Sequence, residues 1–229
     1  MIGFGIDITE KMEASFKIQE SLEEKEALLG EVHHRVKNNL ALVMGLIEMQ
    51  GARTDNEFLK NQFSEVQHRI SAMSLIHEKL YKSSNFSKID MADYLQDFVK
   101  FLAGFYGKGK EVKINFDLDS YAATTKTAIP IALIINELVT NSFKYAFNNK
   151  LDGMISISLR NNDGEIELSV ADNGPGVPEG EDFSKKNSLG MKLLTIFTKQ
   201  LKGTYEIISD NGFRTNIKFK HVQEKNLNS

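Results

Sequence analysis

Four short polar clusters lie along the chain, and their residue types can bind a magnesium nucleotide and accept its phosphoryl group. They are His33–Leu40, Asn136–Ala146, Asp172–Pro178 and Ser188–Met191. The first cluster contains imidazoles, which are largely neutral at pH 7 and therefore able to act as nucleophiles. The other three contain the carboxylates, amides, ammonium group and glycines that suit phosphates, a divalent cation and a flat base.

In the second cluster, Glu137, Asn141 and Lys144 have the spacing of one helix face. A carboxylate, an amide oxygen and an ammonium group on one face can order a water, ligate Mg²⁺ and contact a phosphate. The same spacing is also found in a solvated polar stripe on an otherwise buried helix. The residues alone leave both interpretations open.

The third and fourth clusters contain an acceptor and several glycines. Asp172 follows an apolar run, and its carboxylate can accept a hydrogen bond from an exocyclic amine such as that of adenine. Asp-Asn-Gly is also ordinary turn chemistry, which is the alternative here. Gly190 is placed to open a helix whose free N–H groups attract phosphate. The polar segment 179–187 between the clusters is expected to be a lid or a plain loop.

The two adjacent histidines have different positions in a heptad pattern. Apolar residues recur every seven positions at Leu22, Leu29, Val36 and Val43, and a second series follows three residues later. With Val36 at position a, His34 falls at the outermost position f and His33 at position e, beside the seam. Adjacent helical residues point about 100° apart, which disfavours a shared metal ion. We expect His34 to be the exposed nucleophile.

Helices must therefore position the histidines. No Gly or Pro interrupts the chain from Thr9 to Leu29, and Gly51 is placed to end this first helix. Thr54 and Glu57 have capping-box spacing before a second helix at 57–81. A hairpin of two such helices buries its apolar stripes only against another copy, so we expect a homodimer joined through a four-helix bundle.

The second half mixes strands and helices. Alternation of apolar residues predicts half-buried strands, and turn residues such as Asn161–Gly164 separate them. Strands are expected at 111–118, 154–160, 165–171, 204–209 and 213–219, and helices at 90–105, 129–147 and 189–201. This pattern predicts an α+β chain whose second half is a two-layer α/β sandwich with a mixed, largely antiparallel sheet.

Composition excludes several classes of protein. The chain has 229 residues with 28 basic and 31 acidic side chains, so it lacks the basic excess of a dedicated nucleic-acid binder. It has no cysteine, which excludes disulfides and thiolate metal sites. Since no apolar run approaches roughly 20 residues, we expect no membrane contact and a cytoplasmic location. Disorder is expected only in the tail, 223–229.

Taken together, the four clusters resemble those of sensor histidine kinases. The string His34–Leu40 is similar to the branch whose acceptor helix has H-R-x-K-N-N-L, and the later clusters are similar to the N, G1 and G2 boxes of the Bergerat-type ATP-binding domain shared with gyrase, Hsp90 and MutL. The resemblance implies that His34 is the phospho-acceptor, Asn141 a magnesium ligand and Asp172 the adenine reader. It assigns these further residues to the nucleotide site: Glu137, Lys144, Tyr145, Gly174, Gly176, Gly190 and Met191.

The implied reaction is ATP-dependent autophosphorylation of His34 with Mg²⁺, followed by transfer to an aspartate of a response-regulator receiver domain. Gly3–Glu10 resembles the exit of a PAS sensor domain. The expected divisions are the end of a sensor at 1–10, a signalling helix with the phosphotransfer hairpin at 11–84, and the ATP-binding domain at 85–222. The alternatives are a nucleotide-binding scaffold without kinase activity, and an ATPase or serine kinase of the same fold.

The chain departs from the family pattern at two places. The commonest histidine kinases have an acidic residue after the acceptor, where this chain has Arg35. Our hypothesis is that Glu31, three residues earlier, orients or deprotonates His34, with Asn38 assisting from position i+4. In the last strand, Phe213 and Thr215 are exchanged relative to the usual G-T-x-F, so Thr215 is not assigned to the adenine site.

Overall fold

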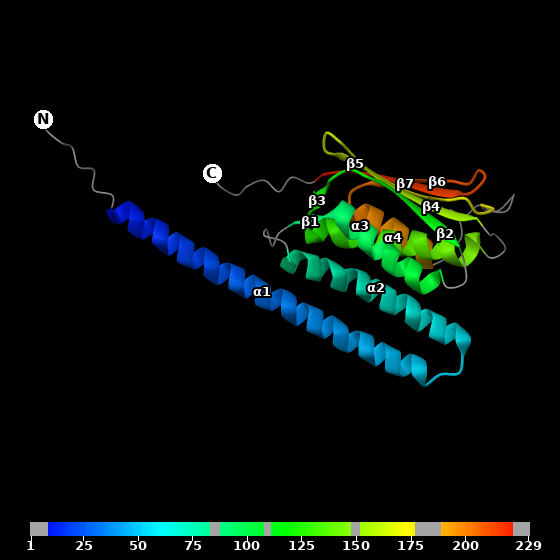
Figure 1. Ribbon diagram of the computed structural model, residues 1–229, viewed down its shortest axis with the longest axis horizontal. Helices are drawn as coiled ribbons and strands as arrows, with labels where there is room; N and C mark the ends of the chain where they lie inside the picture. The colour runs from blue at the N-terminus through cyan, green and yellow to red at the C-terminus, as the bar shows by residue number, and fades with distance from the viewer. Residues whose placement is uncertain (1–8, 83–87, 108–110, 148–151, 177–188, 222–229) are drawn as a thin grey trace, which may run out of the picture.

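The computed structural model describes residues 9–82, 88–107, 111–147, 152–176 and 189–221. The PAS-like residues before 9, the polar segment 179–187 and the tail 223–229 lie outside the described residues. The first half is helical and the second half combines helices with a sheet, which confirms the α+β class (Figure 1).

The first half is a helical hairpin. Helix α1 runs from Thr9 to Ala52 and helix α2 from Glu57 to Lys82, close to the predicted bounds. The predicted capping box is wrong in one respect: Asn56 caps α2, because its Oδ1 accepts from the Phe58 and Leu59 backbone N–H groups at 2.9 and 3.2 Å. An asparagine directly before the helix reaches these free donors better than a threonine two residues further away.

The second half contains a five-stranded sheet in the order β2-β4-β5-β7-β6. Strands β2 and β4 are parallel and every other pair in this sheet is antiparallel, as predicted. Its strands are β2 (Val112–Leu118), β4 (Gly153–Asn162), β5 (Glu165–Asp172), β6 (Thr204–Ile208) and β7 (Phe213–Lys220). A two-residue pair, β1 (Ile89–Asp90) with β3 (Ala122–Ala123), was too short to predict.

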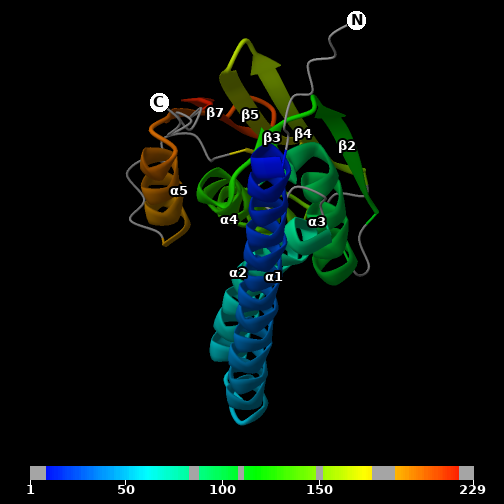
Figure 2. The same cartoon turned by 90° about the vertical axis from the view of Figure 1, so that its left-hand side faces the viewer.

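Three helices cover the face of the sheet that is turned toward the hairpin (Figures 1 and 2). They are α3 (Met91–Tyr106), α4 (Thr125–Asn141) and α5 (Leu189–Gln200). Helix α4 begins four residues before the predicted bound, so Pro130 lies in its second turn rather than its first. Its continuation, Ser142–Ala146, is a π-helix, which the periodicity did not predict. Wide turns of this kind are common at functional sites.

The core lies between the sheet and α3 and α4, and it also includes one face of the hairpin. Ile131, Ile134 and Ile135 of α4 are fully buried. Ala72 and Ile76 of α2 are also fully buried and belong to the same apolar cluster. The second half of the chain therefore packs directly on α2, which the sequence did not predict.

The rest of the hairpin leaves apolar side chains exposed in the single chain. Positions a and d of the heptad pattern include Leu22, Val32, Val43 and Leu46, all more than two-fifths exposed. None of the helices in the described ranges is long and apolar enough to cross a membrane.

Candidate functional site

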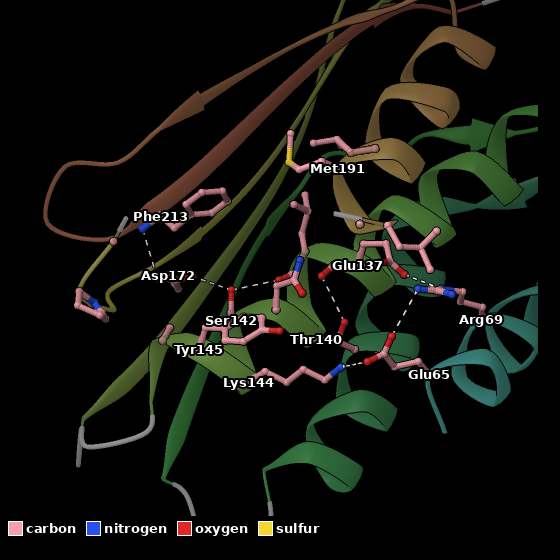
Figure 3. A pocket seen from close by; sticks show the side chains of 18 of the residues that line it. Glu65, Arg69, Glu137, Thr140, Ser142, Lys144, Tyr145, Asp172, Met191 and Phe213 are labelled. Atoms are coloured by element: carbon pink, nitrogen blue, oxygen red, sulfur yellow. Dashed lines mark hydrogen bonds and ion pairs between the residues drawn. The ribbon is translucent and has the colours of Figure 1, made fainter. Parts of the chain in front are cut away.

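A cavity of about 610 Å³ lies where α2, α4, the π-helix, α5 and the ends of β5 and β7 meet (Figure 3). This volume is in the range of roughly 300–1,000 Å³ that is usual for small-molecule sites. Its wall includes residues of the second, third and fourth polar clusters, together with side chains of α2.

Asp172 is held at one end of the cavity by three donors. Its Oδ2 accepts from Ser142 Oγ at 2.7 Å, and its Oδ1 accepts from the backbone N–H groups of Gly174 and Phe213 at 2.9 and 3.3 Å. These contacts fix the carboxylate in one orientation at the end of β5. A fixed acceptor beside an apolar wall suits recognition of an amine on a flat base.

Two glycines allow the backbone to close around this carboxylate. A Cβ at Gly174 would lie 2.5 Å from the Ala146 Cβ, so the turn packs tightly against the π-helix. A Cβ at Gly212 would lie 2.1 Å from the Asp172 carbonyl oxygen, and Gly212 has a φ of +142°. Gly212 was not predicted as a site residue, although Asp-Asn-Gly before the last strand was a signal for it.

Glu137, Asn141 and Gly190 converge further along the cavity. A Cβ at Gly190 would lie 3.3 Å from Glu137 Oε2 and 3.6 Å from Asn141 Nδ2. Glycine thus leaves open the space between α5 and the polar face of α4. Carboxylate and amide oxygens are the ligands that Mg²⁺ prefers.

The described residues hold no group of three or more acidic, histidine or cysteine side chains that would bind a metal alone. Mg²⁺ usually takes one or two protein oxygens and completes its shell with substrate phosphates and water. Glu137 and Asn141 fit that kind of site.

The remaining predicted pocket residues have distinct positions. Met191 is buried at the start of α5, and Gly176 lines the cavity with a φ of +73°. Tyr145 lines it too but is 69% exposed. Lys144 points toward α2, where its Nζ forms an ion pair with Glu65.

Helix α2 forms a wall of this cavity with Gln62, Glu65 and Arg69. Arg69 Nε donates to Glu137 Oε1 at 2.7 Å, and the Arg69 guanidinium also lies 3.7 Å from Glu65 Oε2. These residues were not predicted as part of the site. They are about 70 positions from Glu137 and Lys144, and their charges resemble any solvated helix face.

His34 is exposed, as predicted, and is not among the described residues that line the cavity. Asn38 Nδ2 lies 3.3 Å from His34 Nδ1, so Asn38 contacts the imidazole. Glu31 has a hydrogen-bond partner that was not expected: its Oε1 accepts from Arg35 Nε at 2.6 Å. This contact lowers the pKa of Glu31, with the Arg35 hydrogen bond the largest cause. A guanidinium at i+4 is a strong donor to this carboxylate because its hydrogen bond is charge-assisted.

Contacts between α1 and α2 fix the distance from His34 to the cavity. Met44 faces Ser71 and Lys37 faces Glu78, which gives one antiparallel register and places Leu46 opposite Arg69. His34 is twelve residues from Leu46, or about 18 Å along the helix at 1.5 Å per residue. The imidazole and the cavity are therefore several helical turns apart.

Thr215, one of the two exchanged residues, is fully buried in β7. Within the described ranges its Oγ1 has no hydrogen-bond partner. It pairs with Val170, two residues before Asp172, while Phe213 lines the cavity. An aromatic ring, that of Phe213, therefore lies at the cavity wall, at the position where the usual G-T-x-F pattern has a threonine.

Two family models match the chain in succession. The first is described as histidine kinase and matches residues 31–106, and the second, described as histidine kinase-, DNA gyrase B- and HSP90-like ATPase, matches residues 126–225.

Two curated relatives match over most of the chain. Sensor histidine kinase PdtaS of Mycobacterium tuberculosis is 28% identical over 182 residues, 79% of this chain and 36% of that protein. Blue-light-activated histidine kinase 2 of Erythrobacter litoralis is 26% identical over 205 residues, 87% of this chain and 58% of that protein. The chain thus spans less than two thirds of each relative.

A solved structure has the same fold. The histidine kinase domain of a blue-light-activated histidine kinase from Erythrobacter litoralis superposes with a TM-score of 0.64 at 24% identity. The match covers 88% of this chain and 94% of that one.

Proposed function

Since this chain is a sensor histidine kinase core with an ATP-binding domain of the gyrase and Hsp90 class, we propose that it binds ATP with Mg²⁺ and phosphorylates His34. The observation that carries the proposal is the cavity itself. It gathers a fixed carboxylate, an acidic and an amide side chain and the glycine-opened start of a helix in one space. An adenine nucleotide needs this combination of groups.

The adenine end of the site is Asp172. Its two oxygens are oriented by Ser142 and Gly174, and the exocyclic amine of adenine donates to the carboxylate. The apolar side chains of Met191 and Phe213 flank the base.

At the phosphate end, Gly190 at the start of α5 brings free backbone N–H groups toward the phosphates. Glu137 and Asn141 would hold Mg²⁺, which supplies charge neutralisation for the phosphates when it is bound. Lys144 and Tyr145 complete this end of the site.

His34 supplies the nucleophile. A nitrogen lone pair of the neutral imidazole attacks the γ-phosphorus, a new N–P bond forms, and the bond to the β-phosphate oxygen breaks to release ADP. The attacking tautomer carries its proton on Nδ1 and has Nε2 free. An Asn38 amide turned to present its oxygen to Nδ1–H would hold that tautomer, because amide orientation is set by its hydrogen bonds. Once the phosphohistidine forms, the proton on Nδ1 is released to solvent, to which His34 is exposed.

The phosphohistidine then passes its phosphoryl group to an aspartate of a response-regulator receiver domain, docked on the hairpin around His34. A PAS-like sensor upstream of α1 supplies the input. This assignment places the reaction in the cytoplasm, without nucleic acid or membrane contact.

The test is incubation of the purified chain with γ-labelled ATP and Mg²⁺, comparing wild type, His34→Gln and His33→Gln. We expect acid-labile, base-stable label that is lost only in His34→Gln. Loss only in His33→Gln would move the acceptor to His33. Bound ATP without any label favours a nucleotide-binding scaffold, and acid-stable label on a serine or threonine of a partner favours a serine kinase.

A further inference from the structure

Four charged side chains join the hairpin to the phosphate end of the cavity in one chain of ion pairs. Glu137 pairs with Arg69, Arg69 with Glu65, and Glu65 with Lys144. Glu65 and Arg69 are one turn apart on α2, while Glu137 and Lys144 are two turns apart on α4 and the π-helix (Figure 3). Each cation of one side thus meets an anion of the other.

These contacts are shielded from solvent. The side chains of Arg69 and Glu137 are 17% and 9% exposed. Fully exposed ion pairs contribute little, but screening by water and salt is weaker for partly buried ones. The Lys144 ammonium also lies 5.9 Å from the centre of the Tyr106 ring, which favours the cation in this position.

The arrangement conflicts with a bound triphosphate. Lys144 is a cation of the proposed phosphate end, yet its charge is neutralised by a carboxylate that lines the same cavity. A triphosphate placed there would be repelled by Glu65 and would compete with Glu65 for Lys144, while Mg²⁺ would compete with Arg69 for Glu137. The docked hairpin and the bound phosphates thus require the same two side chains.

We propose that Glu65 and Arg69 form an electrostatic latch, which holds the ATP-binding domain on α2 until the phosphates of Mg·ATP displace it. The latch rests on the proposed function, because it assigns a regulation to that same nucleotide site. Coupling of this kind is reciprocal: docking weakens nucleotide binding by the factor by which nucleotide weakens docking. The release also serves the reaction, because in the docked position His34 is about 18 Å along the hairpin from the residues that face the cavity.

The first experiment measures binding by calorimetry on the full chain, with two ligands and a matched control. The ligands are Mg²⁺ with a non-hydrolysable ATP analogue, and adenosine, which has no phosphates. The variants are Glu65→Gln and Glu78→Gln: the same chemical change on the same helix, but Glu78 pairs with Lys37 of α1 rather than with the cavity.

We expect Glu65→Gln to tighten the ATP analogue by about threefold or more, a change of the size that a partly shielded ion pair produces. Adenosine affinity should stay unchanged, and Glu78→Gln should leave both affinities unchanged. An unchanged or weaker affinity for the analogue in Glu65→Gln, or an equal shift for adenosine, overturns the latch alone. A wild-type chain that binds neither ligand overturns the proposed function and the latch with it.

Arg69→Gln tests the other half of the latch. The latch predicts tighter binding of the ATP analogue, because Glu137 is released from its guanidinium partner. Weaker binding would instead make Arg69 a ligand of the phosphates and overturn its role in the latch.

A second measurement follows the docking directly. The chain has no cysteine, so cysteines introduced at the exposed positions Asn61 of α2 and Lys199 of α5 are the only sites for spin labels. We expect a narrow distance distribution without ligand and a broad or shifted one with Mg²⁺ and the ATP analogue, while adenosine leaves it narrow. An identical distribution under all three conditions contradicts the latch.

Discussion

Asp172 is the residue on which the adenine end of the site depends. Three donors from Ser142, Gly174 and Phe213 converge on its two oxygens. Asp172→Asn replaces one acceptor oxygen with a donor, which leaves at least one of these groups facing an N–H. We expect a loss of adenosine affinity of about tenfold or more and a decrease in the free energy of unfolding of about 1–3 kcal/mol.

Calorimetry with adenosine and urea unfolding measure the two effects of Asp172→Asn. Ser142→Ala is the control, because it removes a single hydroxyl donor and should cost about 1 kcal/mol of stability while retaining the carboxylate. Equal adenosine affinity in Asp172→Asn and wild type would show that the carboxylate does not read the base.

His68 gives a prediction about pH. It is buried between α2 and α3, where Nδ1 lies 2.7 Å from the Tyr106 hydroxyl. Burial, and next the Lys144 charge, lower the pKa of His68 to about 4. An unfolded histidine titrates near 6.5, so between pH 6.5 and 4 the unfolded chain binds a proton that the folded chain does not. The free energy of unfolding should therefore fall as the pH is lowered through this window.

Urea unfolding of wild type and His68→Gln at several pH values tests this expectation. Glutamine keeps a hydrogen-bonding group near Tyr106 but does not titrate, so the variant should show a flatter pH dependence between 6.5 and 4. Parallel pH dependences of the two proteins would mean that His68 is protonated in the folded chain too.

The sequence predicted those parts of the cavity whose residues are close together along the chain. Glu137 and Asn141 share a helix face because of their spacing alone, and Gly190 opens the next helix as expected. Glu65 and Arg69 could not be predicted, because nothing in a charged pair on α2 indicates which distant segment it meets. The hydrogen bond from Arg35 to Glu31 could not be predicted either, since spacing does not rank competing partners.

Among the elements, the π-helix at Ser142–Ala146 and the turn after β5 form one packed unit. The Ser142 hydroxyl donates a hydrogen bond to Asp172, and a Cβ added at Gly174 would lie 2.5 Å from the Ala146 Cβ. Gly174→Ala must push the turn away from the π-helix, and we expect it to decrease the free energy of unfolding by about 1–3 kcal/mol. Nucleotide binding should weaken with it, because the Gly174 N–H orients Asp172.

Gly45→Ala is the matched control for this substitution. Gly45 lies inside α1, about two turns before its end, and an added Cβ would meet nothing within 4 Å, so alanine should stabilise the helix by about 0.5–1 kcal/mol. Thermal unfolding compares the stability of the two variants. A Gly174→Ala chain as stable as wild type would mean that the turn and the π-helix separate freely.

The elements themselves were largely predictable because each has strong local periodicity. The antiparallel hairpin of β4 and β5 follows from alternating strands and their turn residues, whereas the parallel pairing of β2 with β4 was not predicted. The π-helix could not be predicted, because its residues continue the apolar pattern of α4. Its wider turn depends on packing against the end of β5. The extra first turn of α4 was missed because Pro130 is compatible with a helix start.

At the scale of the whole molecule, the hairpin and the ATP-binding half share one apolar core. Ala72 and Ile76 of α2 pack with the buried residues of α3 and α4. Lys79 adds ion pairs with Asp93 and Asp97 of α3. The expected boundary at residue 84 does not reveal this contact, because the apolar stripe of α2 does not indicate which segment it packs against. The docking of the ATP-binding half on α2 therefore depends on tertiary packing, which local sequence patterns do not indicate.

The other face of the hairpin still lacks a partner in the single chain, and this leads to a prediction of dimerisation. Val43 and Leu46 occupy heptad positions a and d, yet they are 41% and 50% exposed. A second hairpin would cover them in a four-helix bundle, at a gain of roughly 25 cal/mol for each Å² of apolar surface buried. We expect the wild-type chain to be a dimer and Leu46→Glu to be a monomer, because a carboxylate buried at position d lacks a partner.

Light scattering after size-exclusion chromatography measures the mass of each variant. Ala41→Glu is the control: it adds the same charge to the same helix, but at position f, where it points away from the seam as His34 does. It should remain a dimer. A dimeric Leu46→Glu with a monomeric Ala41→Glu would place the interface on the His34 face, where a receiver domain could then not dock. The heptad register therefore determines both where the second copy binds and which histidine stays accessible for phosphoryl transfer.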